Sequence, residues 1–269
     1  YNMRIYRPGI WYLNPYLNDS NPTNISQGNS HLDSEKSHSF NLSYSNFTQK
    51  FNINLSARYS FTNNSIEQVT EQVKDTEIEG LQNPTGKEVL YSTYQNIGKS
   101  RNASLSGYVN WNATSNTRIY ANLYGNYTYM EGANGLKNDG WNLFAYGGAQ
   151  QSLPHDWRIS LNIYGQTPWI MLQGKGSSFF DYGLSVNKSF LNKRLTLSAF
   201  ASNFFKKYTS PTSSIEGVGF TQDSWNRYTR QRFGVSVSYR IGELKASVKK
   251  AARTISNDDV KGGGGEGGG

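Results

Sequence analysis

The sequence predicts an all-β transmembrane protein, an antiparallel up-and-down β-barrel with about ten strands in this chain. Three observations support this prediction. The twelve residues from Phe51 to Thr62 alternate apolar and polar side chains at every position, which gives a strand one apolar and one polar face. The alternation returns at least six more times, with no helical pattern between the repeats. Tight turns and long loops alternate between the strands, as they do in membrane barrels.

Alternation and turn residues place the strands in order along the chain. Met3–Pro8 is the end of a first strand, and Ser39–Asn46 turns at Thr48-Gln49 into Phe51–Thr62. A further strand lies within Val89–Trp111. The remaining strands are expected at Arg118–Met130, Trp141–Leu153, Trp157–Gly165, Asp181–Phe190, Arg194–Phe205 and Arg232–Ile241.

The connections fall into two classes that interleave. Short turns lie near residues 48, 114, 155 and 192, and long loops span 9–38, 66–88, 132–140, 170–178 and 207–224. Bacterial barrels place short turns in the periplasm and long loops outside the cell, which predicts a periplasmic C-terminus. We expect strands and loops over residues 1–242 and a basic, Gly-rich periplasmic tail over 243–269.

Composition fits a barrel and excludes other classes. Only 36% of the residues are hydrophobic, and no apolar run approaches the roughly 18 residues of a membrane helix. The chain has no cysteine, hence no disulfide, thiolate metal site or cysteine nucleophile. The net charge of +8 includes six basic and three acidic residues between Arg240 and Lys261. Without a recognition helix, RNA-binding aromatic signature or zinc module, this charge indicates a solvated tail and no nucleic-acid partner.

The polar faces indicate a wide barrel. They are rich in Asn, Ser and Thr, with occasional Arg and Tyr. A barrel of about eight strands is filled by its own side chains, whereas one of about 22 strands can hold a plug. Small neutral side chains cannot fill a narrow lumen. They therefore favour one arc of a wider barrel over a complete barrel of ten strands.

The first 35 residues carry a recognisable series of motifs. These are Arg4-Ile5, Arg7-Pro8, Leu13-Asn14-Pro15-Tyr16, Asn21-Pro22, Gly28-Asn29, Leu32 and Glu35. The series resembles a signature of the outer-membrane β-barrel family of TonB-dependent receptor-like proteins, with Ser30 and Ser34 where that family usually has prolines. The segment Ala251–Asp259, followed by polyglycine, is similar to C-terminal ends in the same family.

The resemblance implies a location and a set of partners. It implies that the chain is the C-terminal portion of an outer-membrane receptor whose whole barrel has about 22 strands. A plug domain, the remaining strands, outer-membrane lipid and, indirectly, the TonB machinery would be its partners, with a surface lipoprotein as a further one. The implied function is energised uptake of a nutrient such as a siderophore, an oligosaccharide or a peptide. No cofactor or metal is implied.

Candidate ligand-binding residues lie in the first long loop. If the Pro- and Asn-rich segment Pro8–Pro22 recognises a ligand, Trp11, Tyr12 and Tyr16 are the expected stacking platforms. A rigid fold-over at the barrel rim explains the same residues, because Pro and Asn fix turns. Phe220, Trp225 and Tyr228 have two interpretations as well, as ligand contacts or as interfacial residues.

Titratable loop residues give weaker signals. His31 and His38 flank Asp33 and Glu35, which suggests a metal site or a catalytic pair, but ordinary loop residues explain them better. The sequence contains no G-x-S-x-G or H-E-x-x-H motif, so we expect no enzyme. The acidic loop 66–88 does not match a calcium loop and is expected to be solvated.

The tryptophans at the strand ends, Trp111, Trp141, Trp157 and Trp169, are expected to anchor the barrel at the membrane interfaces. Two alternatives to a receptor arc remain open at this point. One is a small self-contained outer-membrane barrel acting as a membrane hydrolase or adhesin. The other is a soluble sugar-binding β-sandwich, in which the apolar faces would pack against each other.

Overall fold

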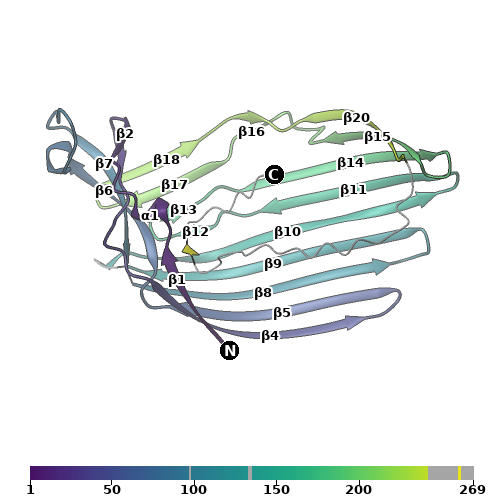
Figure 1. The fold of residues 1–269 in the computed structure, drawn as a ribbon, viewed down its shortest axis with the longest axis horizontal. Coiled ribbons are helices and arrows are strands. Elements are labelled where there is room, and N and C mark those ends of the chain that lie inside the picture. The colour runs from purple at the N-terminus through teal and green to yellow at the C-terminus, as the bar shows by residue number, and fades with distance from the viewer. Residues whose placement is uncertain (97, 133–134, 242–259, 262–269) are drawn as a thin grey trace.

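Ten long strands form one antiparallel sheet in the computed structural model, which describes residues 1–96, 98–132, 135–241 and 260–261 (Figure 1). The strands are β1 (Asn2–Pro8), β4 (Glu35–Phe47), β5 (Phe51–Thr62), β8 (Lys99–Asn112), β9 (Thr117–Glu131), β10 (Lys137–Leu153), β11 (Trp157–Gln166), β14 (Phe179–Phe190), β15 (Leu195–Ser202) and β20 (Arg232–Tyr239). Each of them pairs with the next in this order, which is the predicted up-and-down topology. The barrel fold class is confirmed, although β20 and β1 do not pair with each other among the described residues.

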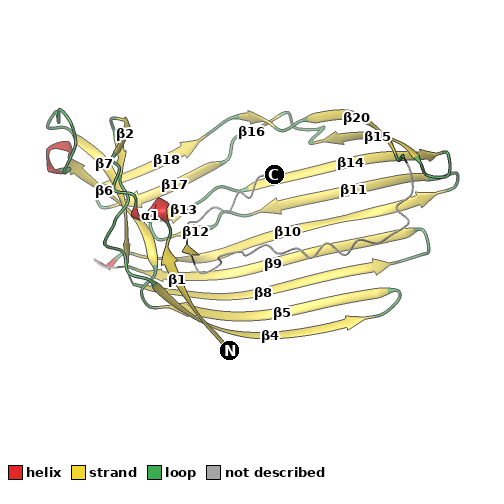
Figure 2. Cartoon of the chain, in the orientation of Figure 1, coloured by secondary structure: helices red, strands yellow, loops and turns green. Residues whose placement is uncertain are grey.

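Short turns connect the strands at one end of the sheet, here called the turn end, and longer segments connect them at the other, the loop end (Figure 2). The turns lie at 48–50, 113–116, 154–156 and 191–194, where the sequence predicts them. His155 and Asp156 have φ of 61° and 58°, and Asn192 has 53°. Asn, Asp and His enter this left-handed region more readily than most residues, which suits the 154–156 turn; in the 191–194 turn Leu191 and Lys193 adopt it as well.

The two faces of the sheet differ as the alternation predicts. Leu55, Leu123 and Leu161 point outward and are 43%, 58% and 44% exposed, with no protein layer over them. The asparagine, serine and threonine side chains occupy the opposite face. An exposed leucine face is what a lipid-bathed barrel wall requires. The β-sandwich alternative, which needs these leucines in a core, is therefore wrong.

Aromatic side chains border this apolar face at both ends. Trp111 and Trp157 lie on it near the turn end, and Trp141 lies on it near the loop end, 5.5 Å from Tyr127. The ammonium group of Lys188 sits 5.4 Å from the Trp157 ring and donates a hydrogen bond to the carbonyl of His155 in the turn. Such a lysine buries its stem in hydrocarbon and keeps its charge at the water boundary.

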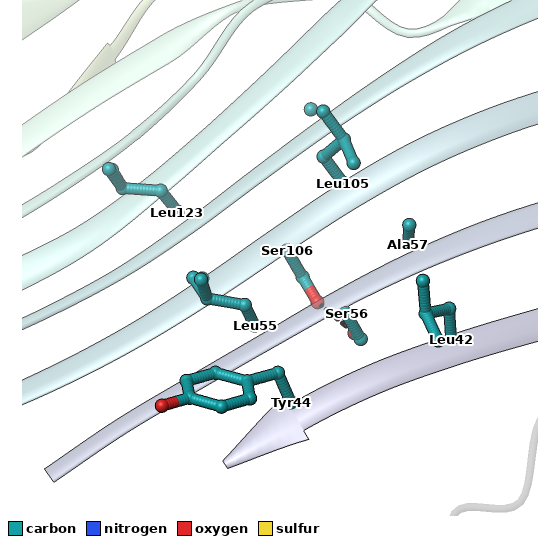
Figure 3. Close-up of a pocket in the computed structure, with 10 residues that line it drawn as sticks. Leu42, Tyr44, Leu55, Ser56, Ala57, Leu105, Ser106 and Leu123 are labelled. Carbon is teal, nitrogen blue, oxygen red and sulfur yellow. Dashed lines mark hydrogen bonds between the residues drawn. The ribbon is translucent and has the colours of Figure 1, made fainter. Parts of the chain in front are cut away.

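Glycines shape a shallow groove on the same apolar face. Leu42, Leu55, Leu105 and Leu123 border a hollow of about 500 Å³ (Figure 3). Gly107 and Gly125 leave room for leucines of neighbouring strands, since a Cβ on Gly107 would lie 3.3 Å from the Leu55 side chain. Acyl chains of a bilayer suffice to fill this groove.

The long loops fold into small sheets of their own at the loop end. One contains β2 (Asn18–Asn21), β3 (Asn24–Ser26), β7 (Glu88–Asn96) and β6 (Ile66–Lys74), and a second contains β12 (Ile170–Met171), β13 (Gly174–Lys175), β17 (Thr212–Gly217) and β18 (Phe220–Trp225). A third pairs β16 (Tyr208–Thr209) with β19 (Tyr228–Thr229). Two single turns of helix, α1 (Ile10–Leu13) and η1 (Asp75–Glu77), complete these segments. Among the described residues, no helix is both long and apolar enough to cross a membrane.

These loop sheets, which we call the cap, contain the buried apolar side chains of the described chain. Ile25, Ile78 and Val89 form one cluster, and Val69 with Leu172 forms another. The prediction that 66–88 is an irregular loop is therefore wrong, since β6 and the start of β7 are paired strands joined by η1 and a tip. The carboxylates of this segment are nevertheless mostly solvated as predicted: Glu71, Glu77, Glu79 and Glu88 are exposed, and Asp75 is buried. The error has a physical reason, because the apolar residues of this hairpin are few and their partners lie in segments distant in the sequence.

The predicted basic tail 243–269 lies outside the described residues except for β21 (Val260–Lys261). That short strand pairs in parallel with Arg7 and Pro8 of β1, where the sequence predicts no strand.

One carboxylate organises the tip of the β6–β7 hairpin. Asp75 is 5% exposed and accepts hydrogen bonds from the backbone N–H and hydroxyl of Thr85 and from the N–H of Gly86, each at 2.7 Å. The N–H of Thr85, followed by the other donors, holds the pKa of Asp75 below its ordinary value. The ionised form is thus the one that the folded tip prefers.

The tip should consequently open in acid. A carboxylate with a lowered pKa stabilises the fold fully above its unfolded pKa of about 3.9, and this contribution disappears as the pH falls through the lower folded value. We expect faster amide exchange over residues 75–87 below about pH 4, measured by hydrogen-exchange mass spectrometry after correction for intrinsic rates. Asp75→Asn should exchange faster already at pH 7 and lose the acid dependence. An unchanged pH profile in that variant would contradict this role of Asp75.

Candidate functional site: a cavity at the loop end of the polar face

Small polar side chains on the polar face bond to one another across strands. The hydroxyls of Ser56 and Ser106 lie 2.6 Å apart, and the Thr128 hydroxyl donates to the Asn102 side-chain oxygen at 2.8 Å. These short side chains satisfy each other and leave the space above them open. The surface is suited to face water or a polar partner.

A cavity of about 660 Å³ opens on this side at the loop end. Strand β14 contributes Phe179 and Asp181, which lie where the strand begins at the loop end. Asn203 and Lys206 come from the segment after β15, and Arg230 comes from the segment before β20. Its other polar lining residues carry neutral amides and hydroxyls: Gln166, Thr167, Ser178, Tyr182, Tyr208, Thr209, Ser210 and Thr212. The volume is typical of small-molecule sites, and the lining is more polar than in most of them.

An ion pair forms the wall of the cavity. The Arg230 guanidinium donates to Asp181 Oδ2, and the side-chain amide of Asn203 donates to Asp181 Oδ1 at 2.7 Å. Arg230 also lies 5.3 Å from the ring centres of Phe179 and Tyr228. Asn203 has a φ of 50°, and its N–H donates to the Tyr182 carbonyl at 2.8 Å. The carboxylate is thus bonded on both oxygens and presents its remaining lone pairs at the cavity.

Breaking this pair should loosen the loops around the cavity. Both side chains are about a quarter exposed, so the penalty is smaller than for a fully buried pair. We expect Arg230→Met to destabilise the segment 204–231 by roughly 1–3 kcal/mol, because Asp181 loses a charged donor. Hydrogen exchange of that segment measures the change. In the double variant with Asp181→Asn most of the loss should be recovered, and a purely additive result would contradict the coupling.

The three predicted ligand-binding aromatics do not gather in one place. Trp11 and Tyr16 are 70% and 71% exposed, and Tyr12 turns inward from α1 to meet Tyr94 edge-on at 4.6 Å. Burial, with the neighbouring Tyr94, raises the pKa of the Tyr12 phenol. Tyr12 lines a separate cavity of about 280 Å³ beside Gln173 and Thr70. Their role as stacking platforms stays a prediction.

The histidines and carboxylates of the first loop are dispersed. His38 accepts or donates a hydrogen bond with the Tyr1 hydroxyl at 2.8 Å and stacks on Phe61 at 4.9 Å. Glu35 is buried and accepts from the N–H of Ile66, which begins the cap hairpin. Among the residues described, no group of three potential ligands could hold a metal ion.

The cavity residues Phe179, Asp181, Asn203 and Arg230 are not apparent from the sequence. They are scattered over some fifty positions and belong to no motif. The available signal is Asp181, an acidic residue at the start of a strand whose other polar-face residues are neutral. Phe220 and Trp225, by contrast, belong to β18 of the cap. Tyr228 belongs to β19, and its ring lies 5.3 Å from the Arg230 guanidinium.

Comparison with known proteins agrees with this architecture. Residues 1–239 match the model of the outer membrane protein beta-barrel family. The solved structure of the copper transporter OprC superposes with a TM-score of 0.58 at 14% identity, covering 88% of this chain and 36% of that chain. The chain therefore spans about a third of the length of that structure. No curated protein sequence matches the chain.

Proposed function

Because the chain belongs to the outer membrane protein β-barrel family, we propose that it forms one arc of the barrel of a TonB-dependent receptor-like transporter for nutrient uptake. The arc supplies part of the lumen wall, the cavity at the loop end and the cap. A plug domain, the remaining strands and the TonB machinery are its proposed partners, and a surface lipoprotein is a further one. It performs no covalent chemistry in this proposal.

The observation that carries the proposal is the pair of open sheet edges. Among the described residues, β20 pairs only with β15, and β4 pairs with β1 only over Glu35–Ser39, so that Phe40–Phe47 lacks a partner on that side. Unpaired backbone N–H and C=O groups cost several kcal/mol each in hydrocarbon, which is why membrane barrels close. Further strands at both edges would satisfy these groups, as would be expected if this arc belongs to a wider barrel.

The orientation follows from loop length. The cap and the cavity are proposed to face outward from the cell, and the four short turns and the end of β20 to face the periplasm. The predicted periplasmic C-terminus is not part of this proposal, because β21 pairs with Arg7 and Pro8 at the loop end of β1. This orientation can be tested with single cysteines, because these 269 residues contain none and any cysteine elsewhere in the full-length receptor can be replaced first. Val218→Cys in a long connection and Asn192→Cys in a short turn are suitable, as Val218 is 90% exposed.

We expect a membrane-impermeant maleimide to label Val218→Cys on intact cells and Asn192→Cys only after lysis. Uptake by the full-length protein should stop when the TonB machinery is deleted or a protonophore is added. Labelling of both sites on intact cells, or of neither, would contradict the orientation. A protein that closes with ten strands and functions without TonB would instead be the small hydrolase or adhesin.

A further inference from the structure

A row of aromatic rings crosses the polar face from near the turn end to the cavity. Tyr120 of β9, Tyr146 of β10, Tyr164 of β11 and Phe179 of β14 belong to successive strands of the sheet. Their ring centres are 5.7, 6.3 and 4.8 Å apart in that order. Tyr120 lies close to the turn between β8 and β9, whereas Phe179 is the first residue of β14 and lines the cavity. The row therefore runs diagonally across the wall.

The surrounding backbone is built to hold the row. The Tyr120 hydroxyl reaches across β10 and donates to the side-chain oxygen of Asn162 on β11. It can do so because Gly148 lies between them, where an added Cβ would be 2.7 Å from that hydroxyl. A guanidinium group covers each end, with Arg118 at 5.5 Å from the Tyr120 ring and Arg230 at 5.3 Å from the Phe179 ring.

The chemistry around the row is weakly basic and rich in hydrogen-bonding groups. The amides and hydroxyls of the cavity offer donors and acceptors, and Asp181 and Arg230 neutralise each other, which leaves Lys206 as the further charge among the lining residues. Tyr146 and Tyr164 remain 41% and 38% exposed. The negative face of an aromatic ring attracts the weakly positive C–H groups of a sugar ring, and hydroxyls satisfy amides and paired charges. Lys206 in the cavity and Arg118 at the far end of the row are the charges that a strongly anionic ligand would meet.

We propose that this row is a saccharide-binding track, along which a neutral oligosaccharide moves from the cavity toward the turn end. The inference rests on the proposed transporter function and adds the substrate class and the residues of the path. Rings on successive strands let one sugar unit leave a ring as the next unit arrives, so the ligand exchanges similar contacts at each step. Gly148 acts as a positioning residue, since it lets Tyr120 reach Asn162.

Binding to the full-length receptor in detergent micelles tests the track. Maltohexaose and xylohexaose are the saccharide probes, and a ferric catecholate and a neutral hexapeptide are the comparison probes, with titration calorimetry as the readout. We expect a hexasaccharide to bind and Tyr164→Ala to weaken its binding about tenfold or more, the size of effect that loss of one ring has where nucleic-acid bases stack on aromatic side chains. Tyr164→Phe should bind nearly as well as the parent. Tyr108→Ala, on the same face, equally exposed at 37% and outside the row, should change nothing.

Several outcomes would overturn the track. The first is that neither hexasaccharide binds. The second is that Tyr164→Ala and Tyr108→Ala weaken saccharide binding equally. The third is that only the binding of the chelate or of the peptide depends on Tyr164. Folding is checked by the resistance of each unheated variant to sodium dodecyl sulfate. A receptor that is folded, located in the outer membrane and TonB-dependent in uptake but indifferent to Tyr164 would remove this inference and leave the transporter function standing. A receptor absent from the outer membrane would remove both.

Discussion

Replacing Leu123 by arginine should destabilise the folded barrel by about 2–4 kcal/mol, the cost of a cationic side chain at the bilayer midplane on the lipid face of a barrel. Leu123 is 58% exposed on the apolar face. It lies midway along β9 between Ile119, which pairs with Trp111 near the turn end, and Tyr127, which pairs with Trp141 near the loop end. The aromatic residues thus mark both interfaces, and Leu123 is as far from water as this strand allows.

Asn122→Arg is the matched control, because it places the same side chain at the same depth on the opposite face. Asn122 pairs with Tyr108 and Tyr146 on the polar face, where water or a plug can solvate a charge. We expect a change within about 1 kcal/mol there. Denaturant unfolding of the full-length receptor in lipid vesicles measures both variants. Equal losses would mean that the two faces have been assigned to the wrong environments.

Strands and turns were predictable because their signals are local. Alternation over Phe51–Thr62 determines which side of β5 meets lipid, and antiparallel pairing transmits that choice to the neighbouring strands. A shift by one residue would put asparagines in hydrocarbon, so register follows from the same pattern. Tight turns such as 154–156 can be recognised in the sequence by residues that accept positive φ. The number of strands followed from counting the alternating segments between these turns.

The cap and the cavity were not predictable because their contacts join distant segments. Gln222 of β18 donates to Asn24 of β3 at 2.8 Å, almost two hundred residues away along the chain. Nothing in the acidic sequence around Glu71 indicates that Ile66 and Val69 are buried by segments from elsewhere. The aromatic row has the same character, since one ring comes from each strand and none stands out within its own strand.

Gln173 should be the side chain on which the cap depends most. It is 9% exposed, in the turn between β12 and β13, and it pairs with the backbone of Thr70 in β6 as another strand would. Its side-chain oxygen accepts from the Thr70 N–H at 2.7 Å, and its amide donates to the Thr70 carbonyl at 2.8 Å. Its own carbonyl accepts from the N–H of Glu216 in β17 at 2.6 Å. Gln173 therefore joins β6 to the sheet that contains β13 and β17, at a junction where Val69 and Leu172 add an apolar contact.

Gln173→Ala should destabilise the cap by about 2–4 kcal/mol, since it leaves both backbone groups of the buried Thr70 without partners, at roughly 1–3 kcal/mol each. Gln173→Glu preserves the shape and the acceptor but cannot donate when ionised, and it buries a charge, so we expect a loss at least as large at pH 7. Gln72→Ala is the control, because Gln72 lies on the same hairpin, is exposed, and its side-chain amide donates to Glu88. Its effect should stay within about 0.5 kcal/mol.

Hydrogen exchange over residues 66–74 and 170–175 measures these changes in the cap separately from the wall. The amide protection of the strands in lipid should stay the same. The separation follows from where the energy resides: the cap is held by burial and by bonds such as those of Gln173, whereas the wall is held by backbone pairing that lipid enforces. Unchanged protection of Thr70 in Gln173→Ala would mean that apolar contacts alone hold the loops together. A loss that spread into β9 and β10 would mean that cap and wall unfold as one unit.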